Sequence, residues 1–277
     1  MTPLPLRLLA VLAHPDDETL GLGGTLARYA VEGVETYLVT ATHGQSGRFR
    51  ELRPGDPGHP GPERLAAIRE AELYAAARVL GLREVHLLGY VDGRLDDADP
   101  REAVARIAAH VRRIRPQVVV TFAQDGGYGH PDHVAIAQLT AAALVAAADP
   151  AHPGAHPPHA AAKFYFMAWS AGTWEAYQEA FKKLTSTVDG VERQAHPWPE
   201  WQLSTRLDTR AYWPVVWQAV NCHDSQVANY AGLGRLSPEH HEGLWGWQTF
   251  YRVFSTVNGG RAREDDLFAG LRPPPAS

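Results

Sequence analysis

The hexapeptide Ala-His-Pro-Asp-Asp-Glu at residues 13–18 constrains this chain most, because it concentrates charge at the end of an apolar run. That run, 8–12, has no polar interruption, which predicts a short strand buried on both faces. Carboxylates crowded beside an imidazole repel one another unless a cation lies among them or solvent screens them. A divalent metal is the economical cation, and His14 with Asp17 offers a nitrogen and an oxygen that suit zinc.

Alternating strand and helix patterns predict an α/β fold for the first half of the chain. Strands are expected at 8–12, 34–40, 85–88, 118–122 and 163–169, and helices at 25–30, 63–80, 100–115 and 134–148. This alternation favours a Rossmann-like, mostly parallel sheet with helices on both faces. The glycine- and proline-dense stretch 43–62 is expected to be a long surface loop that flanks the ligand crevice, with a plain variable insertion as the alternative for its middle portion.

The C-terminal part of the chain differs in kind from this core. All eight tryptophans lie at or beyond Trp169, and the alternation of strands and helices becomes hard to follow. We expect one domain over 1–277, with a strand–helix core at 1–148 and a tryptophan-rich C-terminal extension at 163–277 that shapes the substrate side. A tryptophan can stack on a sugar ring, although tryptophan mostly serves as core.

Composition and charge narrow the class of protein. A net charge of −5 at pH 7 argues against a nucleic-acid partner, and the single cysteine, Cys222, excludes an internal disulfide and a cysteine-rich metal site. No stretch is expected to be long enough to span a membrane. Cleaving the apolar segment 4–13 as a signal peptide would damage the His-Asp motif, so we expect a cytoplasmic enzyme. The oligomeric state stays open, and a homo-oligomer is possible.

A second motif, His-Pro-Asp-His at residues 130–133, follows the strand expected at 118–122 and opens a helix. If the first turn is helical, His130 and His133 lie on roughly the same side of it. His14, Asp17 and His133 would then supply three ligands and leave one tetrahedral position for water, which is the pattern of a catalytic zinc site. Fe²⁺ or Co²⁺ is an alternative, because such a donor set accepts several divalent ions.

Other side chains in the two motifs point to hydrolysis. Zinc lowers the pKa of bound water and polarises a carbonyl. A nearby carboxylate that does not bind the metal is then needed as general base, and Asp16 is adjacent in sequence. His130 would stabilise an oxyanion or protonate a departing amine. Asp132 is expected to orient an imidazole or to lie near the helix dipole, and Glu18 is expected to cap local backbone.

The glycine-rich turn at 21–24 also admits a dinucleotide-binding interpretation. Its spacing differs from G-x-G-x-x-G, however, and the carboxylates of the preceding motif would repel a pyrophosphate. A nucleotide-dependent oxidoreductase is therefore a weak alternative.

The paired motifs resemble the LmbE/PIG-L family of zinc-dependent N-deacetylases, which hydrolyse acetamides on N-acetylglucosamine-containing substrates and share a Rossmann-like fold. Further matches extend the resemblance over most of the chain: Arg69-x-x-Glu72 with Leu80-Gly81, Asp92 after the third strand, and His223-Asp-Ser-Gln226. The resemblance implies zinc as the cofactor and a small-molecule amino sugar as the substrate.

The resemblance also implies a role for each matching residue. Asp16 is similar to the family's general base, and His130 to the histidine that steadies the tetrahedral intermediate. Tyr128 resembles a tyrosine that reaches the substrate carbonyl in the mycothiol-pathway deacetylases. The implied zinc ligands are His14, Asp17 and His133, and the implied substrate contacts are Arg69, Asp92 and His223. For Arg69 the alternative is a surface or structural salt bridge.

We therefore expect a metal-dependent amide hydrolase that releases acetate and a free amine from an N-acetylglucosamine-type substrate. One alternative within the same chemistry is an amidase for a larger thiol conjugate or another acylamino substrate, which the long loop and the tryptophan-rich part would suit. From a different class, the alternative is a non-catalytic carbohydrate-binding or metal-sensing module. The complete set of ligands, base and Tyr128/His130 argues against that module.

Overall fold

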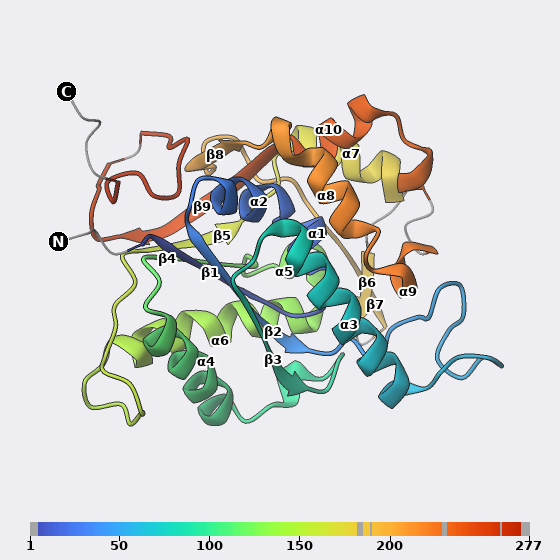
Figure 1. The fold of residues 1–277 in the computed structure, drawn as a ribbon, viewed down its shortest axis with the longest axis horizontal. Helices are drawn as coiled ribbons and strands as arrows, with labels where there is room; N and C mark the ends of the chain where they lie inside the picture. The colour runs from blue at the N-terminus through green and yellow to red at the C-terminus, as the bar shows by residue number, and fades with distance from the viewer. Residues whose placement is uncertain (1–4, 182–184, 189, 229–231, 261, 273–277) are drawn as a thin grey trace.

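The computed structural model describes residues 5–181, 185–188, 190–228, 232–260 and 262–272, which build a seven-stranded sheet between helices (Figure 1). Its N-terminal elements are β1 (Arg7–Leu12), α1 (Asp17–Leu20), α2 (Gly23–Val31), β2 (Glu35–Thr42), α3 (Pro62–Leu80), β3 (Glu84–Tyr90), η1 (Leu95–Asp97), α4 (Pro100–Ile114), β4 (Val118–Thr121), α5 (Gly126–Gly129) and α6 (Pro131–Ala148). Its C-terminal elements are β5 (Lys163–Met167), α7 (Ala171–Phe181), β6 (Thr185–Val188), β7 (Val191–Gln194), β8 (Thr205–Asp208), η2 (Arg210–Tyr212), α8 (Trp213–Val220), α9 (Asp224–Val227), η4 (Leu233–Arg235), α10 (Pro238–Trp245) and β9 (Trp247–Ser255).

The strand order of the sheet is β3-β2-β1-β4-β5-β9-β8. β1 pairs in parallel with β2 on one side and with β4 on the other, whereas β9 and β8 run antiparallel at one edge. The expected fold class, a mostly parallel α/β sheet, is confirmed. The chain order reverses between β1 and β4, and ligands of open α/β sheets bind outside the carboxyl ends of the strands at such a switch point. Both sequence motifs follow these two strands.

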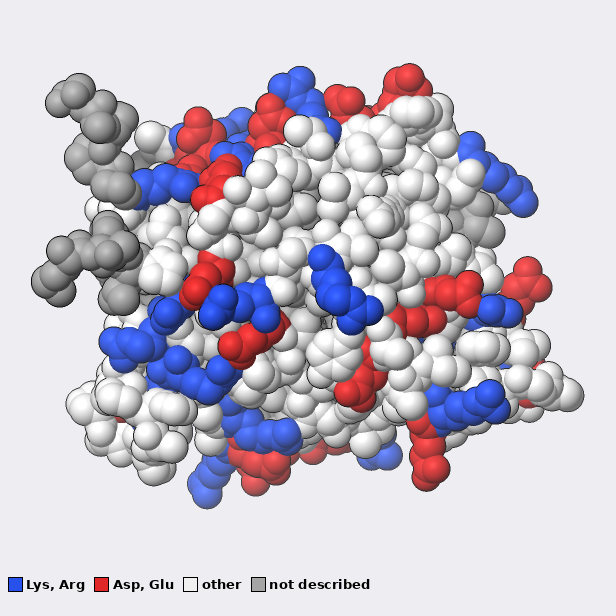
Figure 2. All heavy atoms as spheres, viewed as in Figure 1, with Lys and Arg blue, Asp and Glu red and all other residues white. Residues whose placement is uncertain are grey.

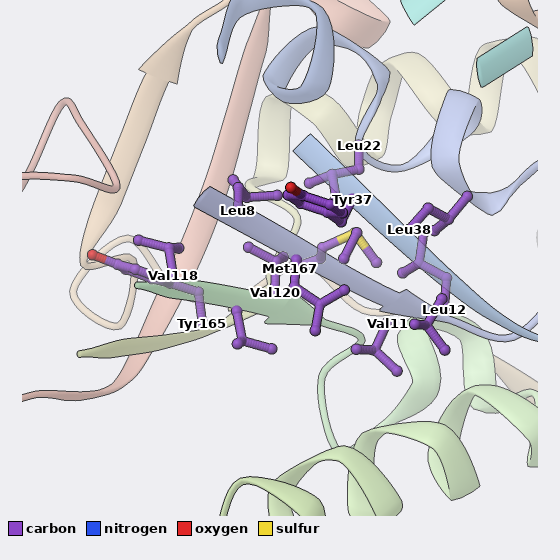
Figure 3. Close-up of a cluster of buried hydrophobic side chains, with 14 of the residues drawn as sticks. Leu8, Val11, Leu12, Leu22, Tyr37, Leu38, Val118, Val120, Tyr165 and Met167 are labelled. Carbon is purple, nitrogen blue, oxygen red and sulfur yellow. The ribbon is translucent and has the colours of Figure 1, made fainter. Parts of the chain in front are cut away.

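The core lies on both faces of the central strands, which explains why their sequences are continuously apolar. Residues 8–12 of β1 and 118–120 of β4 are fully buried. Figure 3 shows side chains of both strands, Leu8, Val11, Leu12, Val118 and Val120, near those of Tyr37, Tyr165 and Met167 from neighbouring strands, and all of them belong to one apolar cluster. In Figure 1, α4 and α6 cover one face of the sheet, and α2, α3 and α8 cover the other. Burial on both faces fixes the position of the strand ends.

The expectation that no stretch is long enough to span a membrane is wrong for helix α6. Its 18 residues are long and apolar enough to cross a membrane by length and composition alone. In the structure half of that helix is buried, and it packs against α4 and β1. Covering a sheet on one side and a second helix on the other requires an apolar surface wider than a single stripe. The packing of α6 therefore accounts for its composition.

The C-terminal part contains structure that its sequence pattern did not predict. β8 and β9 extend the main sheet, and β6 and β7 form a separate two-stranded hairpin. The tryptophans differ in burial: Trp245 is 1% exposed in a second apolar cluster, whereas Trp201 is 81% exposed.

On the face seen in Figure 2, basic and acidic side chains are interspersed.

Candidate active site

The loops after β1 and β4 meet at the carboxyl ends of the sheet, and they bring the two motifs into contact. His14 Nδ1 lies 3.2 Å from His133 Nε2. Asp17 lies between them, with Oδ2 3.6 Å from His14 Nδ1 and Oδ1 3.5 Å from His133 Nε2. Asp17 is itself fixed, because its Oδ2 accepts the backbone N–H groups of Ala13 and His14 at 3.2 and 2.7 Å.

The spacing of these donor atoms fits a single small metal ion. Zinc–nitrogen and zinc–oxygen bonds of about 2.0–2.1 Å in a tetrahedral site place neighbouring donor atoms roughly 3.3 Å apart. The nitrogen–nitrogen separation is 3.2 Å, and each of the two Asp17 oxygens lies 3.5–3.6 Å from one of these nitrogens, which is close to that value. Two imidazoles and a carboxylate also form a donor set that divalent transition metals favour. The residues present therefore fit a metal.

The outer nitrogen of each histidine is held by a second group. His14 Nε2 lies 3.0 Å from Asp132 Oδ2 and 3.1 Å from Asp92 Oδ1, and His133 Nδ1 donates to the Gly126 carbonyl at 3.1 Å. The backbone N–H groups of Gly93 and Leu95 donate to Asp132. Such outer partners fix the tautomer and ring orientation of metal-binding histidines. They leave His14 Nδ1 and His133 Nε2 facing Asp17.

Electrostatics favour positive charge at this donor set, whether as a proton on His14 or as a metal ion that displaces it. Burial lowers the pKa of His133 to about 3, although Asp17 opposes that shift. Burial raises the pKa of Asp17, but His133 and His14 outweigh it and hold that pKa well below its usual range. Burial also lowers the pKa of His14, yet its carboxylate partners raise it well above the ordinary value. A neutral His133, an ionised Asp17 and the carboxylates around His14 make a site that attracts positive charge.

A different third ligand is also available, because ring nitrogens of His14, His130 and His133 lie within 4.8 Å of one another. His130 is the N-cap residue of α6, and its Nδ1 accepts the Asp132 backbone N–H at 3.2 Å. With Nδ1 used in this hydrogen bond, only Nε2 of His130 is left to bind a metal or a substrate. Asp17, by contrast, lies within 3.6 Å of both histidines, which makes it the better placed third ligand.

Asp16 occupies an unusual backbone conformation beside these ligands. Its φ of 105° is in the left-handed region that L-residues rarely adopt. Arg69 on α3 makes an ion pair with Asp16 at 3.1 Å and donates to the carbonyls of Pro15 and Gly44. Arg69 is therefore a buried internal partner of the motif, which agrees with the structural salt bridge given as its alternative role and not with a surface one.

These groups line one cavity of about 350 Å³. Eight of the nine predicted site residues line it: His14, Asp16, Asp17, Arg69, Asp92, Tyr128, His130 and His133. The ninth, His223, is fully buried and does not line the cavity in the described part of the chain. Its Nε2 lies 2.7 Å from Glu18 Oε1. The structure therefore does not place His223 in contact with a substrate.

The cavity also has walls that the sequence interpretation missed. Phe122 stacks on His133 with 3.8 Å between ring centroids, and Trp169 stacks on Tyr177 at 4.7 Å. Gln226 lies three residues after His223 in the motif already singled out, so its spacing was an available signal. Trp169 and Tyr177 had no comparable signal, because α7 brings Tyr177 to the cavity only through tertiary packing.

Comparisons with known proteins identify relatives along nearly the whole chain. Residues 9–144, which include both motifs, match the family model PIG-L, described as GlcNAc-PI de-N-acetylase. The chain is 36% identical to the 1D-myo-inositol 2-acetamido-2-deoxy-alpha-D-glucopyranoside deacetylase of Kineococcus radiotolerans, over 97% of this chain and 84% of that protein. It is 38% identical to the protein of the same name from Thermobifida fusca, over 95% and 99% of the two chains.

A solved structure with the same fold has a different activity. The 4-carboxy-2-hydroxymuconate hydratase of Pseudomonas putida KT2440 matches with a TM-score of 0.69 at 20% identity, over 93% of this chain and all of that one. At such identity the likeness shows the fold alone, and a fold can host unrelated reactions. Family membership rests instead on the two deacetylases and on the matched motifs. This chain belongs to the PIG-L (LmbE) family.

Proposed function

We propose that this chain is a zinc-dependent N-deacetylase that hydrolyses the acetamide of an N-acetylglucosamine-type small molecule and releases acetate and a free amine. The observation that carries the proposal is the convergence of three donor residues, whose nearest nitrogen and oxygen atoms lie 3.2–3.6 Å apart, in a cavity that also contains Asp16. The two relatives, whose names give an acetamido-glucopyranoside of inositol as substrate, support an amino sugar bearing a polyol.

The metal would be held by His14, Asp17 and His133, with Asp132 and Gly126 orienting the two imidazoles. When bound there, zinc supplies a Lewis acid that polarises the acetyl carbonyl and lowers the pKa of water toward neutrality.

The chain's own residues would move the protons. The Asp16 carboxylate, kept in place by Arg69, accepts the proton of the attacking water as general base. His130 Nδ1 accepts a backbone N–H, so in the neutral ring the proton is on Nε2. That Nε2–H can donate a hydrogen bond to the developing oxyanion, and the proton that Asp16 has accepted from water then passes to the departing amine. Burial and the surrounding carboxylates raise the pKa of Tyr128 far above its usual value, so its hydroxyl also remains a donor.

The cavity supports a sugar-sized substrate. Its volume of about 350 Å³ lies in the range typical of small-molecule sites. Arg69 and Asp92 offer charged hydrogen-bonding groups for hydroxyls, and the Trp169 ring offers an apolar surface for a pyranose face. Small-molecule sites commonly combine apolar walls with a few polar groups that fix the orientation of the ligand.

The test is a substrate panel with the zinc-loaded protein. It contains N-acetylglucosaminyl-inositol, other acetylated amino sugars, an acylated thiol conjugate and a 2-hydroxymuconate, and it measures free amine, acetate and hydration separately. We expect amine and acetate in equal amounts from an acetylated amino sugar. Amine release from the thiol conjugate alone would favour the larger-substrate amidase, and hydration alone would overturn the proposal. Binding of sugars without any turnover would instead indicate a carbohydrate-binding module.

A further inference from the structure

The conformation of Asp16 requires support from outside its own residue. Asp16 is not glycine, yet its φ is 105° and its ψ is −25° immediately before α1 begins. A residue in this region persists only when the surrounding structure holds it there. Its backbone N–H donates to Glu18 Oε2 at 2.9 Å, so the carboxylate two residues later stabilises the turn at Asp16.

Glu18 is in turn held from the opposite end of the sequence. Its Oε1 lies 2.7 Å from His223 Nε2, and both side chains are fully buried. Burial lowers the pKa of His223, but Glu18 more than compensates and raises it above its ordinary value. His223 Nδ1 has no hydrogen-bond partner within the described part of the chain. The bond to Glu18 is thus the polar contact that accounts for a buried histidine here.

The segment that carries His223 is anchored on α3, the helix that also carries Arg69. The backbone N–H and the hydroxyl of Ser225 donate to Glu72 at 2.7 and 2.6 Å. Arg69 and Glu72, one helical turn apart on α3, therefore act on the same turn from two directions. Arg69 contacts the Asp16 carboxylate directly, and Glu72 fixes the segment whose histidine reaches Glu18.

We propose that Glu18 and His223 are positioning residues that hold Asp16 in its left-handed conformation and thereby aim its carboxylate at the reacting water. This inference rests on the proposed function for the role of Asp16. Neither residue contacts the substrate: Glu18 and His223 act through the backbone N–H of Asp16. The motif at residues 13–18 and the motif at residues 223–226 thus act together on the conformation of Asp16.

The sharpest test compares Glu18→Gln with Glu18→Met. The two side chains have similar length, but only glutamine can accept the Asp16 N–H. We expect kcat for Glu18→Met to be at least tenfold below that for Glu18→Gln, with KM values within twofold and one zinc bound per chain in both. Crystal structures of the two variants should show a positive φ at residue 16 in Glu18→Gln and a changed φ in Glu18→Met.

A second pair of variants acts at the other end of the contact. His223→Gln keeps a donor for Glu18, whereas His223→Leu fills the space without one. We expect His223→Gln to recover most of the kcat that His223→Leu loses, at unchanged KM. This pair still decides the question where Glu18→Met does not fold.

His241→Leu is the matched control, because His241 is also buried, but its Nε2 hydrogen-bonds to the Leu233 carbonyl and not, in the described part of the chain, to Glu18. It should lower Tm while leaving kcat within twofold. Equal kcat and an unchanged residue-16 φ in Glu18→Met and Glu18→Gln would overturn the inference, as would a fall of kcat in His241→Leu equal to that in His223→Leu. A wild-type enzyme that releases no acetate would refute the proposed function instead, and the φ comparison would still test the positioning.

Discussion

Two buried clusters of charge lie at opposite ends of the sheet, and they differ in how completely their charges are matched. At the amino end of β5, Glu264 binds Lys163 at 2.6 Å and Arg252 at 2.8 Å, and the Tyr165 hydroxyl donates to it. At the carboxyl ends of β1 and β4, Asp16, Asp17 and Asp92 line the cavity, and the buried Asp132 lies beside His14.

The difference distinguishes a structural cluster from a ligand site. The Glu264 carboxylate is fully satisfied by protein donors, so the cluster has no need of another cation. The carboxylates at the other end outnumber the guanidinium beside them, and they face a cavity. Their surplus of negative charge and acceptor atoms calls for a cation from outside. Buried charge alone therefore does not indicate a ligand-binding site. Carboxylates that are incompletely paired and lie beside a cavity do indicate one.

The largest effect is expected from Asp16→Ala, which removes the proposed base without touching a metal ligand. General-base catalysis contributes about 10²–10⁴-fold, so kcat should fall by that factor while zinc remains bound. Steady-state acetate release and zinc stoichiometry measure the two quantities. Wild-type kcat in a zinc-loaded Asp16→Ala enzyme would remove the base from the proposal.

Asp17→Ala and His130→Ala separate the two possible third ligands. Losing a direct ligand should weaken zinc binding by more than the roughly 10–100-fold typical of an outer partner. We expect that loss for Asp17→Ala, and a zinc Kd within a few-fold of wild type for His130→Ala. Competition with a chelating dye gives both constants. The reverse result would make His130 the ligand.

Glu264→Gln tests the matched cluster and should act on stability alone. Removing one partner of a buried pair typically costs about 3–5 kcal/mol, so the free energy of unfolding should fall by about 3 kcal/mol at pH 7 with kcat unchanged. Its partners, led by Lys163, lower the pKa of Glu264 to about 2 against burial, which raises it. A depressed carboxyl pKa stabilises the fold above the unfolded value of about 4.5. The difference from wild type should therefore shrink as pH falls from about 4.5 toward 2, as urea unfolding at several pH values would show.

Asp132→Asn is expected to have the smallest effect, because it changes a group that touches the metal site only through His14. The Asp132 carboxylate accepts from Gly93 and Leu95 and contacts His14 Nε2, and an amide cannot accept at both of its ends. Zinc affinity should fall by about 10–100-fold. An unchanged zinc Kd would show that His14 is oriented without Asp132.

The first half of the fold was predictable because its periodicity is strong. β1 and β4 are buried on both faces and read as unbroken apolar runs, and the expected helix 63–80 corresponds to α3. The fold class, the family and the deacetylase class expected from the sequence are confirmed by the sheet and the relatives. The roles of individual site residues remain proposals.

The C-terminal half could not be predicted in the same way. β8 and β9 are added to an existing sheet edge, and they pair with each other across 39–45 residues of sequence, as in Asp208 with Trp247 and Thr205 with Phe250. The hairpin β6–β7 is largely exposed and lacks a buried face to impose alternation. The position of His223 required knowledge of its contact with Glu18, 205 residues away, which no local pattern encodes.

The full burial of residues 8–12 in β1 separates the groups that carry out hydrolysis from those that select the substrate. The donor residues follow the buried strands β1 and β4, while the surrounding walls come from independent segments: Gly47 in the long loop, Trp169 after β5, Tyr177 on α7 and Gln226 on α9. Changes in those walls can adapt such an enzyme to a different acylated amine without disturbing the hydrolytic machinery.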